Sequence, residues 1–314
     1  MLEKTKIISL IGPTATGKTR LSIEIAKDLN GEIINADSMQ LYDTFNIATN
    51  KPNKEEMCDV VHHLFGSLSI YEECSVAKYV KLARNIIKKM DKKKFPIVCG
   101  GTGFYVKSLL NDIFFAEQNN NEEIKKYLKH RANLHGYDYL LSELSKIDLE
   151  RANKLHVNDE KRIIRSLEIY YATGRTLTEQ NKLNRRTDKY NVCSIGLNYK
   201  NRETLYNKIN SRVDRMISLG LEEEARKIFK KDCGNVATAS CVIGYKEFLP
   251  YFKNEISLSE AVENIKKATR HYAKRQITWF LKDKSIFWIY VDECKNFEEI
   301  FYKAKKIINL KFLK

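Results

Sequence analysis

The feature that most constrains this chain is an eight-residue loop, GPTATGKT, at residues 12–19. It fits the pattern G-x-x-x-x-G-K-[ST], and it lies between an apolar run, KIISLIG, and a helical pattern, KTRLSIEIAKDL. A loop of this kind follows a buried strand and wraps its backbone N–H groups around a phosphate. The sequence therefore predicts an α/β protein that binds a diphosphate group beyond the end of its first strand.

The segments that follow repeat this alternation of strand and helix. The runs EIINAD and FPIVCGG predict two further strands, and SVAKYVKLARNIIKKM predicts a helix between them. Strands joined by helices of this length pair in parallel. We therefore predict a doubly wound parallel sheet of the P-loop NTPase-like kind.

The pattern changes near residue 114. Residues 114–190 show several short helical patterns and no convincing strand, with Asn119 to Asn121 as their polar beginning. NVCSIGLNY then returns as a strand, and SIFWIYVDECKNFEEIFYKAKKIINL predicts a last strand and helix. The expected organisation is an α/β core, residues 1–113 and 191–314, interrupted by a helical insertion domain at 114–190.

The charge of the chain favours a polyanionic partner. Its 314 residues carry a net charge of +15 and give a pI near 9.3, which is typical of proteins that bind nucleic acid. A chain rich in Lys, Asn and Ile also arises from the codon bias of an AT-rich genome. Charge alone therefore leaves both explanations open.

The cysteines and the apolar runs bear on the cellular compartment in which the protein is expected. Seven scattered cysteines show neither a C-x-x-C pair nor a zinc spacing, as expected for reduced thiols in the cytosol. No apolar run is long enough to cross a bilayer, and the beginning of the sequence lacks the pattern of a signal peptide. We expect a cytoplasmic protein.

Three predicted strands deliver polar residues to one edge of the sheet. In the loop, Lys18 offers a charge to phosphates, and the Thr19 hydroxyl is suited to Mg²⁺. Asp37 has three interpretations, as a partner of the metal through water, as a general base, or as a cap of the following turn. Thr102 follows the third strand, where its hydroxyl is either a donor to phosphate or a turn residue.

Taken together, these residues resemble the tRNA dimethylallyltransferases, also called tRNA isopentenyltransferases or the IPP transferase family. The resemblance runs in the family's order from residue 12 to about residue 281. It rests on many blocks in register: GPTATGKT, NADSMQLY, IATNKP, HHL, GGTGFYVKSLL, NDEKRIIRSLEIYYATGRTLT, VDRMISLGLEEEA, IGYKEF and ATRHYAKRQITWF.

The resemblance implies a prenyl transfer. The N6 amine of the adenosine next to the 3′ side of the anticodon attacks dimethylallyl diphosphate, and diphosphate leaves. Asp37 is then the general base, and Thr102 contacts the leaving diphosphate. The implied diphosphate ligands are Gly12, Pro13, Thr14, Ala15, Thr16, Gly17, Lys18, Thr19 and Arg212, with Mg²⁺ at Thr19.

The resemblance also implies which residues meet the tRNA anticodon stem-loop. They are Asp37, Ser38, Met39 and Gln40; Lys161, Arg162, Ile163, Ile164 and Arg165; Cys241, Val242, Ile243, Gly244, Tyr245 and Lys246; and Lys274, Arg275, Gln276, Ile277, Thr278, Trp279, Phe280 and Leu281. The target base has to leave the anticodon loop to reach Asp37. Trp279 either stacks on loop bases or packs in the core.

Two departures from the family pattern concern the RNA side. Ser240-Cys241-Val242 stands where Met-Gln-Ala is common, and Lys125 stands where an arginine is common. We interpret His62 and His63 as structural, because adjacent side chains point in different directions.

A monomer is the expected state, with tRNA and dimethylallyl diphosphate as partners.

Two other functions fit parts of the sequence. A small-molecule kinase shares the phosphate loop and the parallel sheet, and it would turn over ATP. A non-catalytic RNA-binding module with a vestigial loop would bind tRNA and yield no product. The ordered polar residues at the strand ends favour the prenyltransferase.

Overall fold

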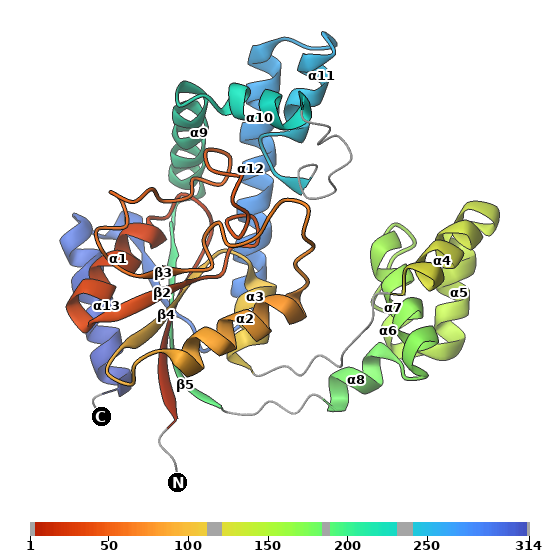
Figure 1. Ribbon diagram of the computed structural model, residues 1–314, viewed down its shortest axis with the longest axis horizontal. Helices are drawn as coiled ribbons and strands as arrows, with labels where there is room; N and C mark the ends of the chain where they lie inside the picture. The colour runs from red at the N-terminus through yellow and green to blue at the C-terminus, as the bar shows by residue number, and fades with distance from the viewer. Residues whose placement is uncertain (1–3, 112–120, 184–188, 231–240, 313–314) are drawn as a thin grey trace. The chain divides into compact units, whose positions relative to one another are not determined.

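The computed structural model describes residues 4–111, 121–183, 189–230 and 241–312 of the chain. These residues form two compact units (Figure 1). The core unit comprises Met1–Leu110 and Asp188–Lys314, and the insert unit comprises Asn111–Thr187. These boundaries lie within a few residues of those expected from the sequence.

A six-stranded parallel sheet forms the centre of the core unit. Its order is β3-β2-β4-β1-β5-β6, and each neighbouring pair is parallel. The strands are β1 (Thr5–Ile11), β2 (Gly31–Asn35), β3 (His62–His63), β4 (Phe95–Gly100), β5 (Tyr190–Asn198) and β6 (Phe287–Tyr290). β1 lies inside the sheet and is buried from Ile7 to Ile11, which explains its continuous apolar run.

Helices cover both faces of this sheet. α1 (Lys18–Leu29) and α13 (Phe297–Phe312) lie side by side on one face, and their apolar side chains join one buried cluster with β1, β4 and β5 (Figure 1). α2 (Val76–Lys89) packs against α3 (Gly103–Leu110), and α3 contacts β4. The doubly wound sheet expected from the sequence is confirmed.

Further helices of the core unit follow β5 in the described part of the chain. They are α9 (Arg202–Ser218), α10 (Leu221–Lys230), the short helices η3 (Lys246–Phe248) and α11 (Leu249–Phe252), and the long α12 (Leu258–Phe280). A further short helix, η4, spans Val291–Glu293. α12 packs along α9 and also touches α3, so it reaches the sheet edge where the site lies.

Local signals end and begin these elements as expected. Asn30 adopts the left-handed conformation and caps α1, and Gly31 follows directly as the first residue of β2. Ser75 caps α2 by accepting a hydrogen bond from the Lys78 N–H. Ser257 and Glu260 form a capping box at the start of α12.

The described residues of the insert unit form helices joined by turns, without a strand. It contains α4 (Glu122–His135), α5 (Tyr137–Ile147), α6 (Leu149–Ala152), α7 (Glu160–Thr173) and α8 (Leu177–Leu183). These helices share their own core, centred on Leu128, Leu140, Ile163 and Leu167. Asn121 caps α4, whereas Asn119 and Asn120 lie outside the described residues.

The edge strand β3 was not expected from the sequence. His62 and His63 pair with Ile33 and Ile34 of β2. The His62 Nδ1 atom hydrogen-bonds the Val60 carbonyl, and the His63 Nε2 atom lies 2.7 Å from a Glu32 carboxylate oxygen. The two rings therefore have different partners, in agreement with a structural role.

Candidate functional site

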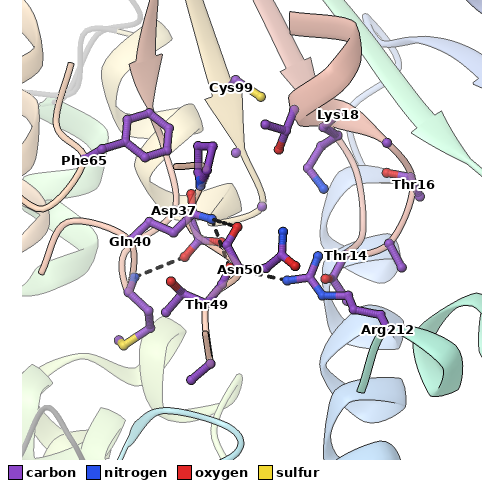
Figure 2. A pocket seen from close by; sticks show the side chains of 18 of the residues that line it. Thr14, Thr16, Lys18, Asp37, Gln40, Thr49, Asn50, Phe65, Cys99 and Arg212 are labelled. Carbon is purple, nitrogen blue, oxygen red and sulfur yellow. Dashed lines mark hydrogen bonds between the residues drawn. The ribbon is translucent and has the colours of Figure 1, made fainter. Parts of the chain in front are cut away.

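A pocket of about 800 Å³ opens at the carboxyl ends of β1, β2 and β4. The phosphate loop, the segment after β2 and the loop near Thr49 line it, together with α9 and α12. Figure 2 shows Lys18, Asp37 and Arg212 gathered around this space. Residues far apart in the sequence therefore meet here, as the strand-end argument predicted.

The phosphate loop has a backbone that only small residues allow. Gly12 has φ 137°, and a Cβ atom there would lie 2.2 Å from the Leu197 carbonyl oxygen. Gly17 has φ 84° and directly precedes α1, whose first turn carries no acidic residue. The positive end of the α1 dipole therefore points at the loop, which favours an anion there.

Lys18 lies inside the curve of this loop. Its Nζ atom donates to the Pro13 carbonyl at 2.6 Å, and the Thr16 hydroxyl donates to the same oxygen at 2.9 Å. Burial, together with the neighbouring Arg212, lowers the pKa of Lys18 to about 8, although Cys99 and Asp37 oppose the shift. Two cations side by side in a desolvated pocket make a site for a multivalent anion.

Asp37 is held firmly at the end of β2. Its N–H donates to Asn35 Oδ1 at 2.8 Å, and its Oδ1 atom accepts from the Met39 N–H at 3.1 Å. Burial raises the pKa of the Asp37 carboxyl, while the Met39 N–H, Lys18 and Arg212 oppose this. The carboxylate both caps the turn and lines the pocket, so the capping interpretation and the site interpretation hold together.

The ends of β2 and β4 are tied together at Thr102. Its N–H donates to the Ala36 carbonyl at 3.0 Å, and its hydroxyl accepts from the Ser38 N–H at 3.0 Å. The same hydroxyl lies 3.3 Å from the Ser38 hydroxyl. In this geometry Thr102 supports Ser38, which lines the pocket, and this agrees with the turn interpretation; its contact with diphosphate stays a prediction.

Arg212 comes from α9 and reaches across the pocket. Its Nη2 atom donates to the Thr49 carbonyl at 3.3 Å, and burial lowers its pKa while Asp37 raises it. Gln40 donates to the same carbonyl at 3.0 Å. The loop that carries Thr49 is therefore bound both from the segment after β2 and from α9 (Figure 2).

Glu224 organises this loop, and the sequence did not single it out. Its carboxylate accepts from the N–H groups of Asn46, Ile47 and Ala48 at 2.9 to 3.2 Å. It also accepts from the Tyr245 hydroxyl at 2.7 Å. In the sequence Glu224 is the last of three consecutive glutamates, which look like a solvated helix face, so no local signal separates it from its neighbours.

The segment 241–246 is divided between core and pocket. Val242, Gly244 and Tyr245 are buried, whereas Cys241 and Lys246 are exposed and line the pocket together with Val242 and Ile243. The expected RNA contact of this segment therefore narrows to its exposed members. Ser240 lies outside the described residues.

The end of α12 is divided in the same way. Lys274, Arg275, Thr278, Trp279 and Leu281 are exposed, Ile277 is half-buried, and Gln276 and Phe280 are buried. Trp279 is 41% exposed, and its ring lies edge-on to Phe104 at 6.3 Å between centroids. Trp279 is thus accessible to a base while resting on α3, and its core interpretation is wrong.

Part of the expected RNA contact in the insert unit needs correction. Ile163 and Ile164 are 0% and 7% exposed and belong to the core of that unit, so their side chains cannot reach a partner. Lys161 and Arg162 are exposed and Arg165 is half-buried. Only these three basic side chains of the segment remain candidates. Lys125 is half-buried and pairs with Glu122.

The donor set decides what kind of metal the pocket suits. Among the described residues, His, Cys, Asp and Glu side chains form no group of three or more suited to a metal ion. Thr19 and Asp37 line the pocket and offer one hydroxyl and one carboxylate. This set fits a hard cation such as Mg²⁺ that is shared with substrate phosphates, and it does not fit an all-protein cage.

The described residues also bear on membrane association. None of the helices in these parts of the chain has the length and apolar character needed to span a bilayer.

Comparison with known proteins agrees with this geometry. The family model "IPP transferase" matches residues 40–283. A tRNA dimethylallyltransferase of Caldanaerobacter subterraneus subsp. tengcongensis is 45% identical over 298 residues, which cover 94% of this chain and 95% of the relative.

Solved structures give the same result. A tRNA isopentenylpyrophosphate transferase of Staphylococcus epidermidis matches with TM-score 0.71 and 36% identity, covering 98% of this chain and 100% of its own. A eukaryotic dimethylallyltransferase acting on tRNA matches with TM-score 0.77 and 31% identity, covering 91% of this chain and 74% of its own. These likenesses extend over nearly the whole chain.

Proposed function

Because this chain belongs to the IPP transferase family, we propose that it is a tRNA dimethylallyltransferase. It transfers a dimethylallyl group from dimethylallyl diphosphate to the N6 amine of the adenosine 3′-adjacent to the anticodon. The observation that carries this proposal is one pocket that holds the phosphate loop, two half-buried cations and a half-buried carboxylate. We place the reaction in the cytoplasm, where its tRNA substrate is found.

The loop side of the pocket serves the leaving group. As the allylic carbon–oxygen bond breaks, negative charge grows on the diphosphate. The backbone of residues 14–19 and the N-terminus of α1 bind this group, and Lys18 and Arg212 stabilise the added charge. A kinase would use the same features, so they do not by themselves identify the acceptor.

Asp37 provides the acceptor chemistry. The nitrogen lone pair attacks the allylic carbon, and the amine has to lose a proton as the new bond forms. The burial that raises the pKa of Asp37 makes its carboxylate a better proton acceptor, and the Met39 N–H fixes its orientation. Gln40 and the adjacent Met39 belong to the segment that we propose meets the tRNA loop.

A divalent metal is generally used by enzymes of this kind, and we propose Mg²⁺. Thr19 would hold it through its hydroxyl, and when bound it supplies positive charge to the diphosphate. The residues of the chain perform the other tasks, which are to orient the diphosphate, to exclude water and to accept the proton.

The RNA partner is the anticodon stem-loop. We propose that the exposed residues of 241–246 and of 274–281 receive the loop, since both segments border the pocket. The basic side chains on α7 contact the stem through phosphates. A base that reaches Asp37 has to leave the stack of the anticodon loop and loses stacking energy. An exposed ring such as Trp279 can restore part of that energy by stacking on a base.

The direct test is incubation of the protein with unmodified tRNA, Mg²⁺ and labelled dimethylallyl diphosphate. Digestion of the tRNA to nucleosides and mass spectrometry should detect N6-isopentenyladenosine. Robust ATP hydrolysis without this product would indicate a kinase. Binding of tRNA without product, unaffected by Asp37→Ala, would indicate a non-catalytic module.

A further inference from the structure

Gln276 lies in the segment that resembles a tRNA contact, yet its side chain is almost completely buried. It is 5% exposed, while Lys274, Arg275, Thr278 and Trp279 around it are exposed. Its amide is buried between the phosphate loop and the end of β4. A polar side chain that is buried so completely has to be explained by its partners.

Both ends of the amide are used, and each joins a different strand end. The Gln276 Oε1 atom accepts from the Thr14 N–H at 3.0 Å. The Nε2 atom donates to the Gly101 carbonyl at 3.0 Å. The opposite orientation of the amide would place donor against donor and acceptor against acceptor, so the two bonds fix each other.

The bond to Thr14 controls the peptide unit between Pro13 and Thr14. The carbonyl of this unit accepts from Lys18 Nζ at 2.6 Å and from the Thr16 hydroxyl at 2.9 Å, inside the loop. Its N–H points outward to Gln276. Gln276 thereby sets the direction of the carbonyl that contacts the phosphate-binding lysine.

The loop needs such support because its backbone is unusual. Ala15, the residue after Thr14, has φ 66°, in the left-handed region that side chains with a Cβ disfavour. Such a conformation persists where the surroundings hold it in place. The Gln276 bond holds the Pro13–Thr14 peptide, which lies one peptide before Ala15.

The close approach of α12 also depends on two glycines. A Cβ atom at Gly101 would lie 2.1 Å from Gln276 Nε2, and one at Gly103 would lie 2.1 Å from the Trp279 ring. The positions 276 and 279 fall on one face of α12. The end of α12 is therefore seated in a hollow that the β4–α3 turn leaves open.

We propose that Gln276 is a positioning residue for the diphosphate site, which holds the Pro13–Thr14 peptide so that Lys18 and the loop amides meet the diphosphate correctly. Its amide hydrogen-bonds Thr14 and Gly101 of the chain itself, so it acts through the loop. This inference rests on the proposed function for its kinetic readout, and it is separate from the expectation that the segment 274–281 contacts RNA.

The test uses Gln276→Met, which keeps the length and volume of the side chain and removes both hydrogen bonds. Losing two neutral hydrogen bonds predicts roughly a tenfold rise in KM for dimethylallyl diphosphate, with a lower kcat. The KM for tRNA should stay within about twofold of the unchanged enzyme. Isothermal titration with inorganic pyrophosphate and Mg²⁺ should show the same loss of affinity without any turnover.

A matched control is Lys266→Met on the same helix. Lys266 pairs with Asp214 of α9 and with Glu263, so this variant removes a tether of α12 that does not involve the loop. Its affinity for pyrophosphate should be unchanged. If both variants lower the melting temperature equally and neither changes pyrophosphate affinity, Gln276 is only structural and the inference is wrong.

Gly101→Ala approaches the same contact from its other side. The added methyl group would displace the Gln276 amide, so this variant should reproduce the kinetic effect of Gln276→Met. The double variant should be no worse than either single one, because both remove the same bond. Full additivity, or a rise in KM for tRNA alone, would overturn the proposal.

The two proposals fail in distinguishable ways. If the unchanged protein makes no prenylated adenosine, the proposed function fails, but the pyrophosphate titration still decides the role of Gln276. If prenyl transfer proceeds and Gln276→Met leaves pyrophosphate affinity intact, only the inference fails.

Discussion

The pocket of the core unit and the α7 helix of the insert unit use charge in opposite ways. In the pocket, burial shifts the pKa values of Lys18, Asp37 and Arg212 from their ordinary positions, and the three groups act on one another. On α7, Arg162 pairs with Asp159 and Arg165 pairs with Glu168, each three residues away. The charges of the pocket are convergent, because they come from distant parts of the sequence to one place. The ion pairs on α7 are local, because both partners lie within one turn of the helix.

This difference has consequences for function. Moving a buried charge changes proton affinity and the stabilisation of a transition state, so few residues carry large effects. Partly exposed pairs contribute little to stability and are readily exchanged for other partners such as phosphates. We therefore expect changes in the pocket to lower kcat steeply, and changes on α7 to weaken tRNA binding in small, salt-dependent steps.

The largest effect should come from Asp37→Asn. The amide oxygen can still accept from the Met39 N–H, so the turn is kept while the proton acceptor is lost. Loss of a general base predicts a fall in kcat of about 10² to 10⁴-fold in single-turnover prenyl transfer.

Asp43→Asn is the matched control for this variant. Asp43 lies six positions further along the same loop region and is exposed. It should transfer the prenyl group at the normal rate. An Asp37→Asn enzyme with unchanged kcat would end the assignment of Asp37 as the base.

Replacement of the insert unit tests the division of labour directly. Residues 112–187 would be exchanged for a glycine- and serine-rich linker, which leaves the sheet and the pocket-lining residues in the chain. Losing the basic side chains of this unit should weaken tRNA binding by at least about a hundredfold. Pyrophosphate affinity, measured by titration calorimetry, should change little. Loss of both activities in a variant with a normal melting transition would contradict this division.

The sequence predicted which residues line the pocket better than it predicted the hydrogen bonds that hold them in place. The loop at 12–19, the strand before it and Asp37 follow local patterns that depend on a few adjacent residues. The pairing of Gln276 with Thr14 spans 262 positions, and that of Glu224 with Ile47 spans 177. No periodicity or propensity encodes such pairings, because they arise only when α9, α10 and α12 pack beside the sheet edge.

Burial was the other source of error. The resemblance grouped Ile163 and Ile164 with the neighbouring basic side chains as one RNA contact. The structure separates the two sets, because helix positions one apart point to different sides. For Thr102, the bond to Ser38 agrees with the turn interpretation, and the contact with diphosphate stays a prediction. β3 was missed because two residues are too short for a strand pattern.

A plot of kcat/KM against pH should be bell-shaped, with one limb set by Asp37 and the other by Lys18. Asp37 has to be deprotonated to act, and its raised pKa places the acid limb above the usual range of an aspartate. Lys18 has to be protonated, and its charge is lost as the pH rises through its pKa of about 8. Activity should fall about tenfold per pH unit outside these limits.

The Asp37→Asn variant separates the two limbs. Its residual activity should lose the acid limb and keep the basic one. If kcat/KM does not fall up to a pH of about 10, near the ordinary pKa of a lysine, the charge of Lys18 does not govern diphosphate binding in the free enzyme.

The smallest effects should come from single substitutions on α7. Lys161→Ala, Arg162→Ala and Arg165→Ala each remove one proposed partner of a phosphate, so each should weaken tRNA binding by about threefold at moderate salt. The slope of log affinity against log salt should fall by about one for each phosphate that is no longer neutralised. kcat at saturating tRNA should not change, because these side chains lie outside the pocket.

Lys154→Ala distinguishes a placed basic side chain from net charge. Lys154 is exposed in the same unit and pairs with Glu150, so this variant removes one positive charge away from α7. Its salt slope should match that of the unchanged protein. If Lys154→Ala weakens tRNA binding as much as Arg162→Ala does, the insert unit attracts tRNA only through its overall charge. The position of the basic side chains on α7 would then not matter, whereas the positions of the charges in the pocket still would.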